Sequence, residues 1–150
     1  SNQVEHGAEL AVVIGKTCKW VQPEEAHQYI FGYTIANDVT ARDLQYKDGQ
    51  WTRAKGFDTF CPLGPWMETE LDPSDLLISC RVNGELRQMS STKEMIFPIS
   101  QLISYISTIM TLYPGDVILT GTPAGVGVLE IGDEVEISIE GIGLLKNPVR

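Results

Sequence analysis

Glycine and proline interrupt this chain at short intervals, and that spacing limits what it can fold into. The 150 residues include 14 glycines and 8 prolines. Both residue types disfavour helix interiors, so many short strands joined by turns are favoured over long helices. One segment is an exception, because its apolar residues recur at helical spacing and predict an amphipathic helix over 100–112. These residues are Ile99, Leu102, Ile103, Ile106 and Met110.

Several apolar segments predict strands. Residues 8–14 are mostly apolar and are followed by Gly15-Lys16, which ends the run. Segments 76–82 and 85–89 flank Asn83-Gly84, a pair that readily takes the positive φ angles of a type I′ hairpin turn. Apolar and polar residues alternate around 134–140, which predicts a half-exposed strand. A short helix is expected from Pro23. Further strands are expected at 117–120 and at 29–36, although the latter segment could instead partly continue that helix. The pattern predicts a mostly β (α+β) domain over 1–150, with one or two covering helices and no linker.

Composition and charge exclude several classes of protein. Hydrophobic residues make up 43% of the chain and charged residues 21%, which is atypical of disorder. The longest apolar run is too short for a membrane span, and the segment after Ser1 does not look like a signal peptide. The net charge is −9 without a basic patch, which argues against nucleic-acid binding. Three widely spaced cysteines (Cys18, Cys61 and Cys80) indicate neither a disulfide framework nor a zinc site. We expect buried thiols and a reducing cytoplasm.

Three features could carry chemistry. Glu9 and Asp38 lie beside apolar runs, where a charge is costly unless it is paired or binds a metal. Periodicity alone favours a structural carboxylate over a ligand at both positions. Lys55 lies among aromatic residues and beside a glycine; it is either a desolvated functional lysine or a surface lysine lying over aromatic rings. The turn at 119–127 follows a strand and can offer N–H groups and a hydroxyl to an anion. It is not a P-loop, because the lysine and the helix that should follow are absent.

Five segments together are more specific than any of them alone. In chain order they read ELAVVIGK (9–16), NDVTARDLQ (37–45), RAKGFDTF (53–60), VNGE (82–85) and LTGTPAGVG (119–127). On these segments the chain resembles the fumarylacetoacetate hydrolase family. That family includes acylpyruvate hydrolases, oxaloacetate decarboxylases and tautomerases, and isomerases of the 2-hydroxyhepta-2,4-diene-1,7-dioate type. The resemblance implies a mixed β-roll of the family's C-terminal catalytic domain type, and a homodimer.

The resemblance also implies a site. A divalent cation, Mg²⁺ or Mn²⁺ or alternatively Ca²⁺, would be held by Glu9 and Asp38, because hard cations prefer oxygen ligands. Lys55 would be the catalytic lysine, and Gln45 and Thr122 would contact substrate. Of the aromatic residues nearby, Tyr46 could line an entrance, while Trp51 and Phe60 fit either an entrance or core packing.

The sequence departs from the family pattern in two ways. Gly7 stands where the family has its first metal-binding glutamate. Glu5 is on the same strand face as Glu9, but about 13 Å along an extended strand, so it could substitute only if the chain bends. Family members also carry a further N-terminal stretch. The general base of the hydrolases would therefore lie upstream of Ser1, and residues 1–150 would represent the domain without that stretch.

The implied function is that of a divalent-metal-dependent enzyme acting on 2-oxo acids or acylpyruvates through an enolate. Hydrolysis of a C–C bond, decarboxylation and keto–enol tautomerisation or isomerisation all pass through such an intermediate, and these residues do not choose among them or specify the substrate. The expected partners are a small 2-oxo acid and a second copy of the chain, without nucleic acid or membrane, in the cytoplasm. The alternative is a catalytically inactive domain kept for binding or oligomerisation, for which Gly7 is the main support.

Overall fold

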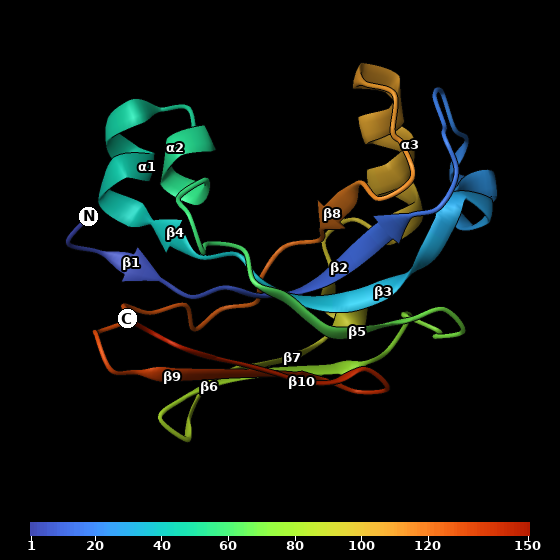
Figure 1. The fold of residues 1–150 in the computed structure, drawn as a ribbon. Helices are drawn as coiled ribbons and strands as arrows, with labels where there is room; N and C mark the ends of the chain where they lie inside the picture. Colours follow the sequence, from blue (N-terminus) through green and yellow to red (C-terminus); the bar gives the residue numbers. More distant parts are fainter.

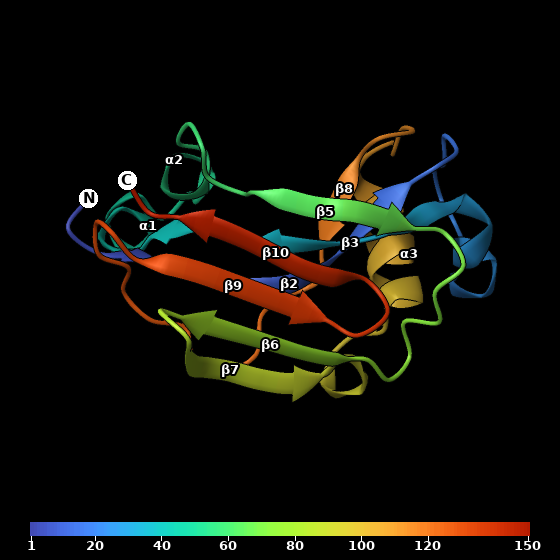
Figure 2. The same cartoon turned by 60° about the horizontal axis from the view of Figure 1, so that its bottom comes forward.

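Two four-stranded antiparallel sheets form the body of the molecule, as seen in a computed structural model that describes residues 1–150 (Figure 1). The first sheet has the order β5-β3-β2-β8, and its strands are Leu63–Glu68, Ile30–Asn37, Ala8–Ile14 and Val117–Leu119. The second has the order β10-β9-β6-β7, and its strands are Gly143–Pro148, Glu134–Ile139, Leu77–Val82 and Glu85–Ser91. Figure 2 shows this second sheet face-on.

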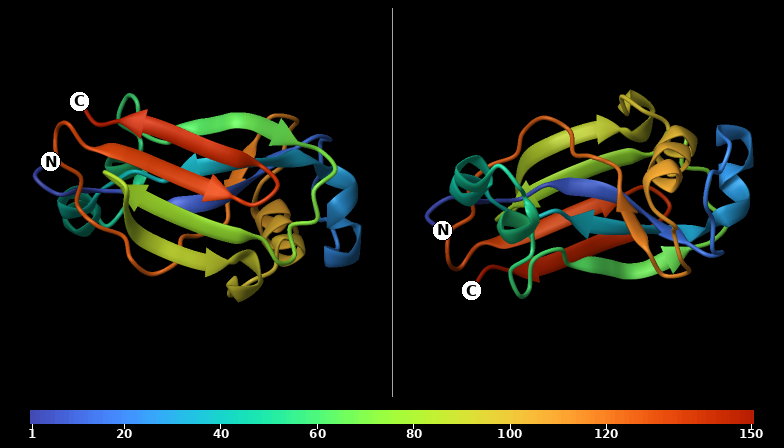
Figure 3. Two further views of the ribbon diagram at one scale, coloured as in Figure 1. Left: turned by 90° about the horizontal axis from the view of Figure 1, so that it is seen from below. Right: turned by 90° about the horizontal axis from the view of Figure 1, so that it is seen from above.

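Short elements cover the two ends of the first sheet. Helix α3 (Ile99–Ile109) and the 3-10 helix η1 (Pro23–Tyr29) pack together at one end. At the other end lie α1 (Arg42–Asp48), α2 (Thr52–Lys55) and a two-stranded sheet of β1 (Val4–Glu5) and β4 (Thr40–Ala41) (Figures 1 and 3). A second 3-10 turn, η2 (Thr92–Glu94), follows β7. No helix has the length and apolar character needed to cross a membrane.

The core lies between the two sheets, and β2 contributes both to it and to the opposite face. Leu10, Val12 and Ile14 belong to the main buried apolar cluster, with residues of β3, β6 and β9. Successive side chains of a strand point to opposite faces, so Glu9 points away from this cluster. Every residue of β2 is buried. The carboxylate of Glu9 therefore lies on the other face of a covered strand, at the end near α1 and α2.

The structure confirms the expected mostly β fold, and its differences from the sequence prediction have local causes. The hairpin forms with φ angles of 52° at Asn83 and 80° at Gly84. Helix α3 ends at Ile109, earlier than predicted, because Leu112 exchanges two backbone hydrogen bonds of 2.9 Å with Cys18. Helices α1 and α2 were not predicted. All three cysteines are free; Cys18 and Cys80 are buried as expected, but Cys61 is only half-buried.

Candidate functional site

Glu9 is a buried carboxylate with a backbone partner. The residue is 4% exposed, and its Oε2 accepts a hydrogen bond of 2.7 Å from the N–H of Gly121. Burial raises the pKa of Glu9 to about 7; the Gly121 N–H opposes the rise, and the neighbouring Asp38 carboxylate adds to it. A strand of the sheet and the turn after β8 thus hold Glu9 in place, beside a second carboxylate.

Asp38 and Lys55 form an ion pair next to Glu9. Asp38 follows β3, and its N–H donates to the carbonyl of Gly7 at 2.8 Å. The Nζ of Lys55, at the end of α2, contacts Oδ2 of Asp38 and donates to Oγ1 of Thr40 at 3.2 Å. The Lys55 Nζ also lies 5.9 Å from the ring centroid of Trp51. Lys55 therefore approaches an aromatic ring as expected, but its main partner is a carboxylate.

Gly7 lies against Asp38, in the same corner of the molecule. A Cβ atom added to it would lie 3.3 Å from the carbonyl oxygen of Asp38 and 3.6 Å from Oγ1 and Cγ2 of Thr122. A side chain at position 7 would therefore begin between Asp38 and Thr122. The glycine leaves that space open.

Glu5 does not fill the space. The chain changes direction after β1, and Glu5 pairs with Thr40 of β4 instead of continuing β2. Its carboxylate accepts hydrogen bonds of 2.8 Å from Nε of Arg42 and Nε2 of Gln3. Although burial raises the pKa of Glu5, these bonds hold it below its ordinary value. No three side chains of His, Cys, Asp or Glu come together to hold a metal ion.

Glu9 and Asp38 nevertheless fit a hard divalent cation as a partial set of ligands. Both offer carboxylate oxygens, and the carbonyl oxygen of Asp38 borders the space at Gly7. Mg²⁺ in proteins commonly takes one or two carboxylates and fills its other positions with water and substrate oxygens. A cation here would compete with Lys55 for Asp38.

Gln45 lies in the same corner but is not bonded to these groups. It is buried on α1, and its Oε1 accepts a hydrogen bond of 2.6 Å from Nη1 of Arg42. Arg42 thus joins Gln45 to Glu5, and Glu5 lies opposite Thr40, which contacts Lys55. No hydrogen bond links Gln45 directly to Glu9, Asp38 or Lys55. Through its bonds to Glu5 and Gln45, Arg42 organises this side of the site.

Thr122 is exposed on the turn after β8, and its Oγ1 accepts a hydrogen bond of 2.8 Å from Nε2 of Gln88. The sequence predicts that backbone N–H groups of this turn are available to bind an anion. The structure corrects this prediction for Gly121, because its N–H already donates a hydrogen bond to Glu9. Thr122 therefore remains the polar group of the turn that faces the space at Gly7.

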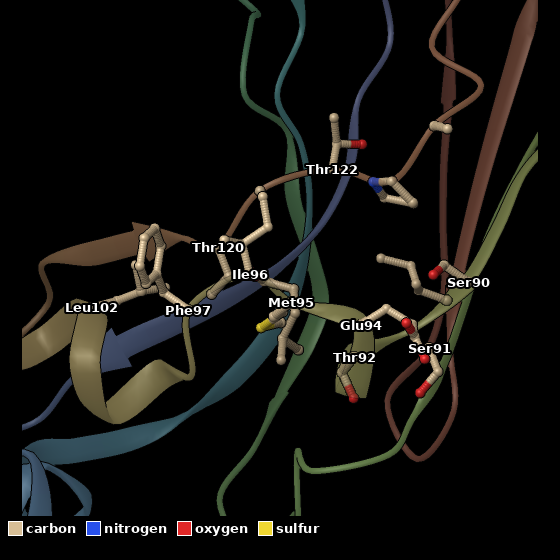
Figure 4. Close-up of a pocket in the computed structure, with 15 residues that line it drawn as sticks. Ser90, Ser91, Thr92, Glu94, Met95, Ile96, Phe97, Leu102, Thr120 and Thr122 are labelled. Atoms are coloured by element: carbon tan, nitrogen blue, oxygen red, sulfur yellow. The ribbon is translucent and has the colours of Figure 1, made fainter.

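A pocket of about 420 Å³ extends from this turn. In Figure 4 Thr122 lies at one edge, and Phe97 and Leu102 lie on the opposite side with Met95 and Ile96 between them. Glu94 is the one charged residue among the 15 that line it. The pocket therefore offers apolar contacts and no cationic side chain.

The family follows from a comparison of the whole sequence. Residues 1–150 match the family model described as fumarylacetoacetate (FAA) hydrolase C-terminal. The chain belongs to the FAA hydrolase family. Its members are enzymes with hydrolase, isomerase and tautomerase names, as the following relatives illustrate.

Mitochondrial oxaloacetate tautomerase Fahd2a of Rattus norvegicus is 48% identical over 160 residues, covering 99% of this chain and 51% of that protein. The structure of 2-hydroxyhepta-2,4-diene-1,7-dioate isomerase from Mycobacterium marinum matches with a TM-score of 0.98 at 56% identity, covering 99% of this chain and 59% of that one. Maleylpyruvate hydrolase from Sphingobium sp. SYK-6, solved with manganese(II) and pyruvate, matches with a TM-score of 0.90 at 40% identity, covering 98% and 54%.

This FAA hydrolase family chain matches only part of the length of its relatives. It spans 63, 57 and 59% of the length of three further proteins that it matches. The shared part includes the two sheets and the corner that holds Glu9, Asp38 and Lys55.

Sequence reasoning missed two buried residues behind Thr122. His6 and Gln88 are each 1% exposed and contact one another. A polar residue at an inward position of β7 is a signal for Gln88, whereas nothing in the sequence around His6 indicates burial. Of the aromatic residues, Trp51 is 57% exposed and Tyr46 is 79% exposed, so core packing is excluded for Trp51. Phe60 is half-buried against Phe57, with ring centroids 5.4 Å apart.

Proposed function

We propose that residues 1–150 form the catalytic domain of a divalent-metal-dependent enzyme that acts on a 2-oxo acid or an acylpyruvate through an enolate. The observation that carries this proposal is the meeting of Glu9, Asp38 and Lys55 beside the open space at Gly7. Membership of the FAA hydrolase family supports it, as does the manganese and pyruvate complex of a family hydrolase.

Glu9 and Asp38 would hold Mg²⁺ or Mn²⁺, with Ca²⁺ as a further candidate. When bound there, the cation would supply positive charge that stabilises an enolate. Lys55 would stabilise the same developing charge, or move a proton to or from the carbon that reacts. Thr122 would donate a hydrogen bond from its hydroxyl to the substrate carboxylate. Gln45, held by Arg42, would orient the substrate oxygens.

One enolate can lead to hydrolysis, decarboxylation or tautomerisation. We propose proton movement next to the 2-oxo group as the step for which this chain holds a candidate side chain, namely Lys55. The tautomerase and isomerase names of relatives support this choice. The tail of the substrate would enter the pocket beside Thr122. Because that pocket has no lysine or arginine, an uncharged acyl tail should fit better than a second carboxylate.

The test is Mn²⁺-dependent turnover of acetylpyruvate and oxaloacetate by this chain and by its Gly7→Glu variant. We expect slow turnover by the parent, faster turnover by the variant, and preference for acetylpyruvate. Activity of the variant alone would identify Gly7 as the position that limits the parent. Inactivity of both proteins in the presence of Mn²⁺ would contradict the proposal.

The alternative proposal is a catalytically inactive domain kept for binding or oligomerisation. Gly7, and the lack of a third carboxylate in the cluster, favour it. Thermal unfolding in millimolar Mn²⁺ separates the two. A ligand at 100 times its Kd stabilises the native state by about 2.7 kcal/mol, so a functioning site raises the melting temperature. An unchanged melting temperature supports the inactive domain.

We also propose that the chain works as a homodimer in the cytoplasm. Exposed Trp66 and Leu144, on neighbouring strands β5 and β10, offer apolar surface for a second copy. The three free cysteines are consistent with a reducing compartment. Light scattering after size-exclusion chromatography would give the oligomeric state, and a monomer at micromolar concentration would contradict the dimer.

A further inference from the structure

The side-chain amide of Gln88 uses its full hydrogen-bonding capacity. Its Oε1 accepts bonds of 3.1 Å from the backbone N–H of Ala8 and from Nδ1 of His6. Its Nε2 donates bonds of 2.8 Å to Oγ1 of Thr122 and to the carbonyl of Pro123. An amide has two acceptor positions on oxygen and two hydrogens on nitrogen, so no capacity remains. Gln88 thus connects β7 of one sheet to β2 of the other, and to the turn that carries Thr122.

Two backbone groups decide which way this amide points. The N–H of Ala8 can only donate and the carbonyl of Pro123 can only accept. A flipped amide would place its NH₂ group against the Ala8 N–H and its oxygen against the Pro123 carbonyl, which would lose both bonds. The amide nitrogen therefore faces Thr122, and the Thr122 oxygen is the acceptor in that bond.

The position of the Thr122 proton follows from this. Because its oxygen receives a hydrogen from Gln88, the hydroxyl directs its own hydrogen elsewhere. The Thr122 hydroxyl hydrogen has no other partner within the protein, and Oγ1 lies 3.6 Å from the place that a Cβ atom on Gly7 would occupy. The hydroxyl is thus prepared as a donor on the exposed side of the turn.

His6 supports the same arrangement from behind. The Gln88 oxygen can only accept, so Nδ1 of His6 carries the hydrogen in the bond between them. The other nitrogen, Nε2, is buried without a partner. A charged ring would carry a second hydrogen on Nε2, where that hydrogen would have no acceptor. A neutral ring leaves Nε2 without a hydrogen.

We propose that Gln88 is a positioning residue that fixes the hydroxyl of Thr122 as a hydrogen-bond donor to the carboxylate of the substrate. This inference rests on the proposed function, in which Thr122 binds that carboxylate. Hydrogen bonds to an ionised acceptor are stronger than neutral ones. A hydroxyl whose proton is already free to face the substrate loses no internal bond on binding.

The test is a double-mutant cycle with Gln88→Glu and Thr122→Val, and the probe is pyruvate in the presence of saturating Mn²⁺. A carboxylate at position 88 accepts a hydrogen bond from the Thr122 hydroxyl and so turns that hydrogen away from the substrate. We expect Gln88→Glu to raise the Kd of pyruvate about tenfold, as expected for one charge-assisted bond. In the Thr122→Val background, which lacks the hydroxyl, the same change should have no further effect. Turnover should show a raised KM with a smaller change in kcat.

Controls separate positioning from folding. Gln101→Glu makes the same chemical change on the exposed surface of α3 and should leave the Kd of pyruvate unchanged. The Kd of Mn²⁺ should also be unchanged in Gln88→Glu. If that variant does not fold, Gln88→Asn, which keeps the amide but is too short to reach Thr122, takes its place in the cycle. The rise in the Kd of pyruvate should then be smaller, because the Thr122 hydroxyl is released but not turned away, and it should again vanish in the Thr122→Val background.

Two results would overturn this inference alone: a pyruvate Kd that Gln88→Glu does not change, or an equal loss with and without the Thr122 hydroxyl. A Thr122→Val variant that binds pyruvate like the parent, or a parent that does not bind it, would instead remove the proposed function of the site. The inference about Gln88 would then fall with it.

Discussion

The Oε2 atom of Glu9 accepts a 2.7 Å hydrogen bond from the backbone N–H of Gly121, and this bond joins β2 to the turn that carries Thr122. Glu9 is the only charged residue of β2 and is buried on the face opposite the main core. The bond therefore has a structural role in addition to any role in binding a cation, and substitutions must preserve an acceptor for the Gly121 N–H.

Glu9 should make the metal-free protein less stable as the pH rises. Burial raises its pKa from 4.5 to about 7, so the folded state binds the proton more tightly than the unfolded state. The resulting stabilisation is full below pH 4.5 and is lost as the pH rises to about 7, a loss of about 3 kcal/mol. Glu9→Gln keeps an oxygen acceptor and does not titrate. With chelator present, its advantage in melting temperature over the parent should grow from pH 5 to pH 8. An equal pH dependence would contradict the assignment.

Metal affinity should distinguish Glu9 and Asp38 from Glu5. Glu5 is paired with Arg42 at 2.8 Å and lies on a different strand from Glu9. Glu9→Gln and Asp38→Asn should each abolish the Mn²⁺-dependent rise in melting temperature, whereas Glu5→Gln should retain it after correction for its own lower stability. Isothermal titration with Mn²⁺ gives the affinities directly. A loss with Glu5→Gln as large as that with Glu9→Gln would place Glu5 in the cation site.

The sequence predicts these strands well where the signal is local. Residues 8–14 and the Asn83-Gly84 hairpin follow from apolar runs and turn chemistry, and the structure has both. The end of α3 depends instead on pairing between Cys18 and Leu112, which periodicity does not show. Tertiary contacts override a local pattern in such cases.

In the candidate site, too, residues in local motifs can be predicted and long-range contacts cannot. Glu9, Asp38, Lys55, Gln45 and Thr122 can be named from short motifs, although their roles stay predictions. Their connections cannot be predicted in this way, because Gln88 is 80 residues from Ala8 and 34 from Thr122. The sequence pattern also placed Glu5 on the same strand face as Glu9. In the structure Glu5 belongs to β1, which pairs with β4 and is separate from β2.

Removal of the Lys55 ammonium should reduce turnover far more than stability. Its ion pair with Asp38 is partly exposed, so Lys55→Met should cost about 1 kcal/mol of unfolding free energy or less. Proton transfer by a positioned side chain contributes about 100- to 10,000-fold to rate, so kcat should fall at least about 100-fold. Lys47→Met, at an exposed position of α1, is the matched control and should retain activity. Full activity of Lys55→Met would show that this lysine takes no part in the reaction.

Acid should destabilise the protein through His6. Burial lowers the pKa of His6 below its ordinary value of 6.5, and the nearby Arg87 adds to this, while the bond with Gln88 opposes it. The unfolded chain therefore binds a proton below pH 6.5 that the folded chain does not bind. The contribution of neutral His6 is complete above pH 6.5 and is lost as the pH falls toward the lowered pKa, which is the opposite slope to that of Glu9. The Glu9→Gln background removes the opposing pH dependence of Glu9. In that background urea unfolding should show that the free energy of unfolding falls from pH 7 to pH 5. His6→Gln in that background should flatten the slope, whereas His27→Gln, at an exposed position, should not. An unchanged slope after His6→Gln would show that His6 does not set the acid sensitivity.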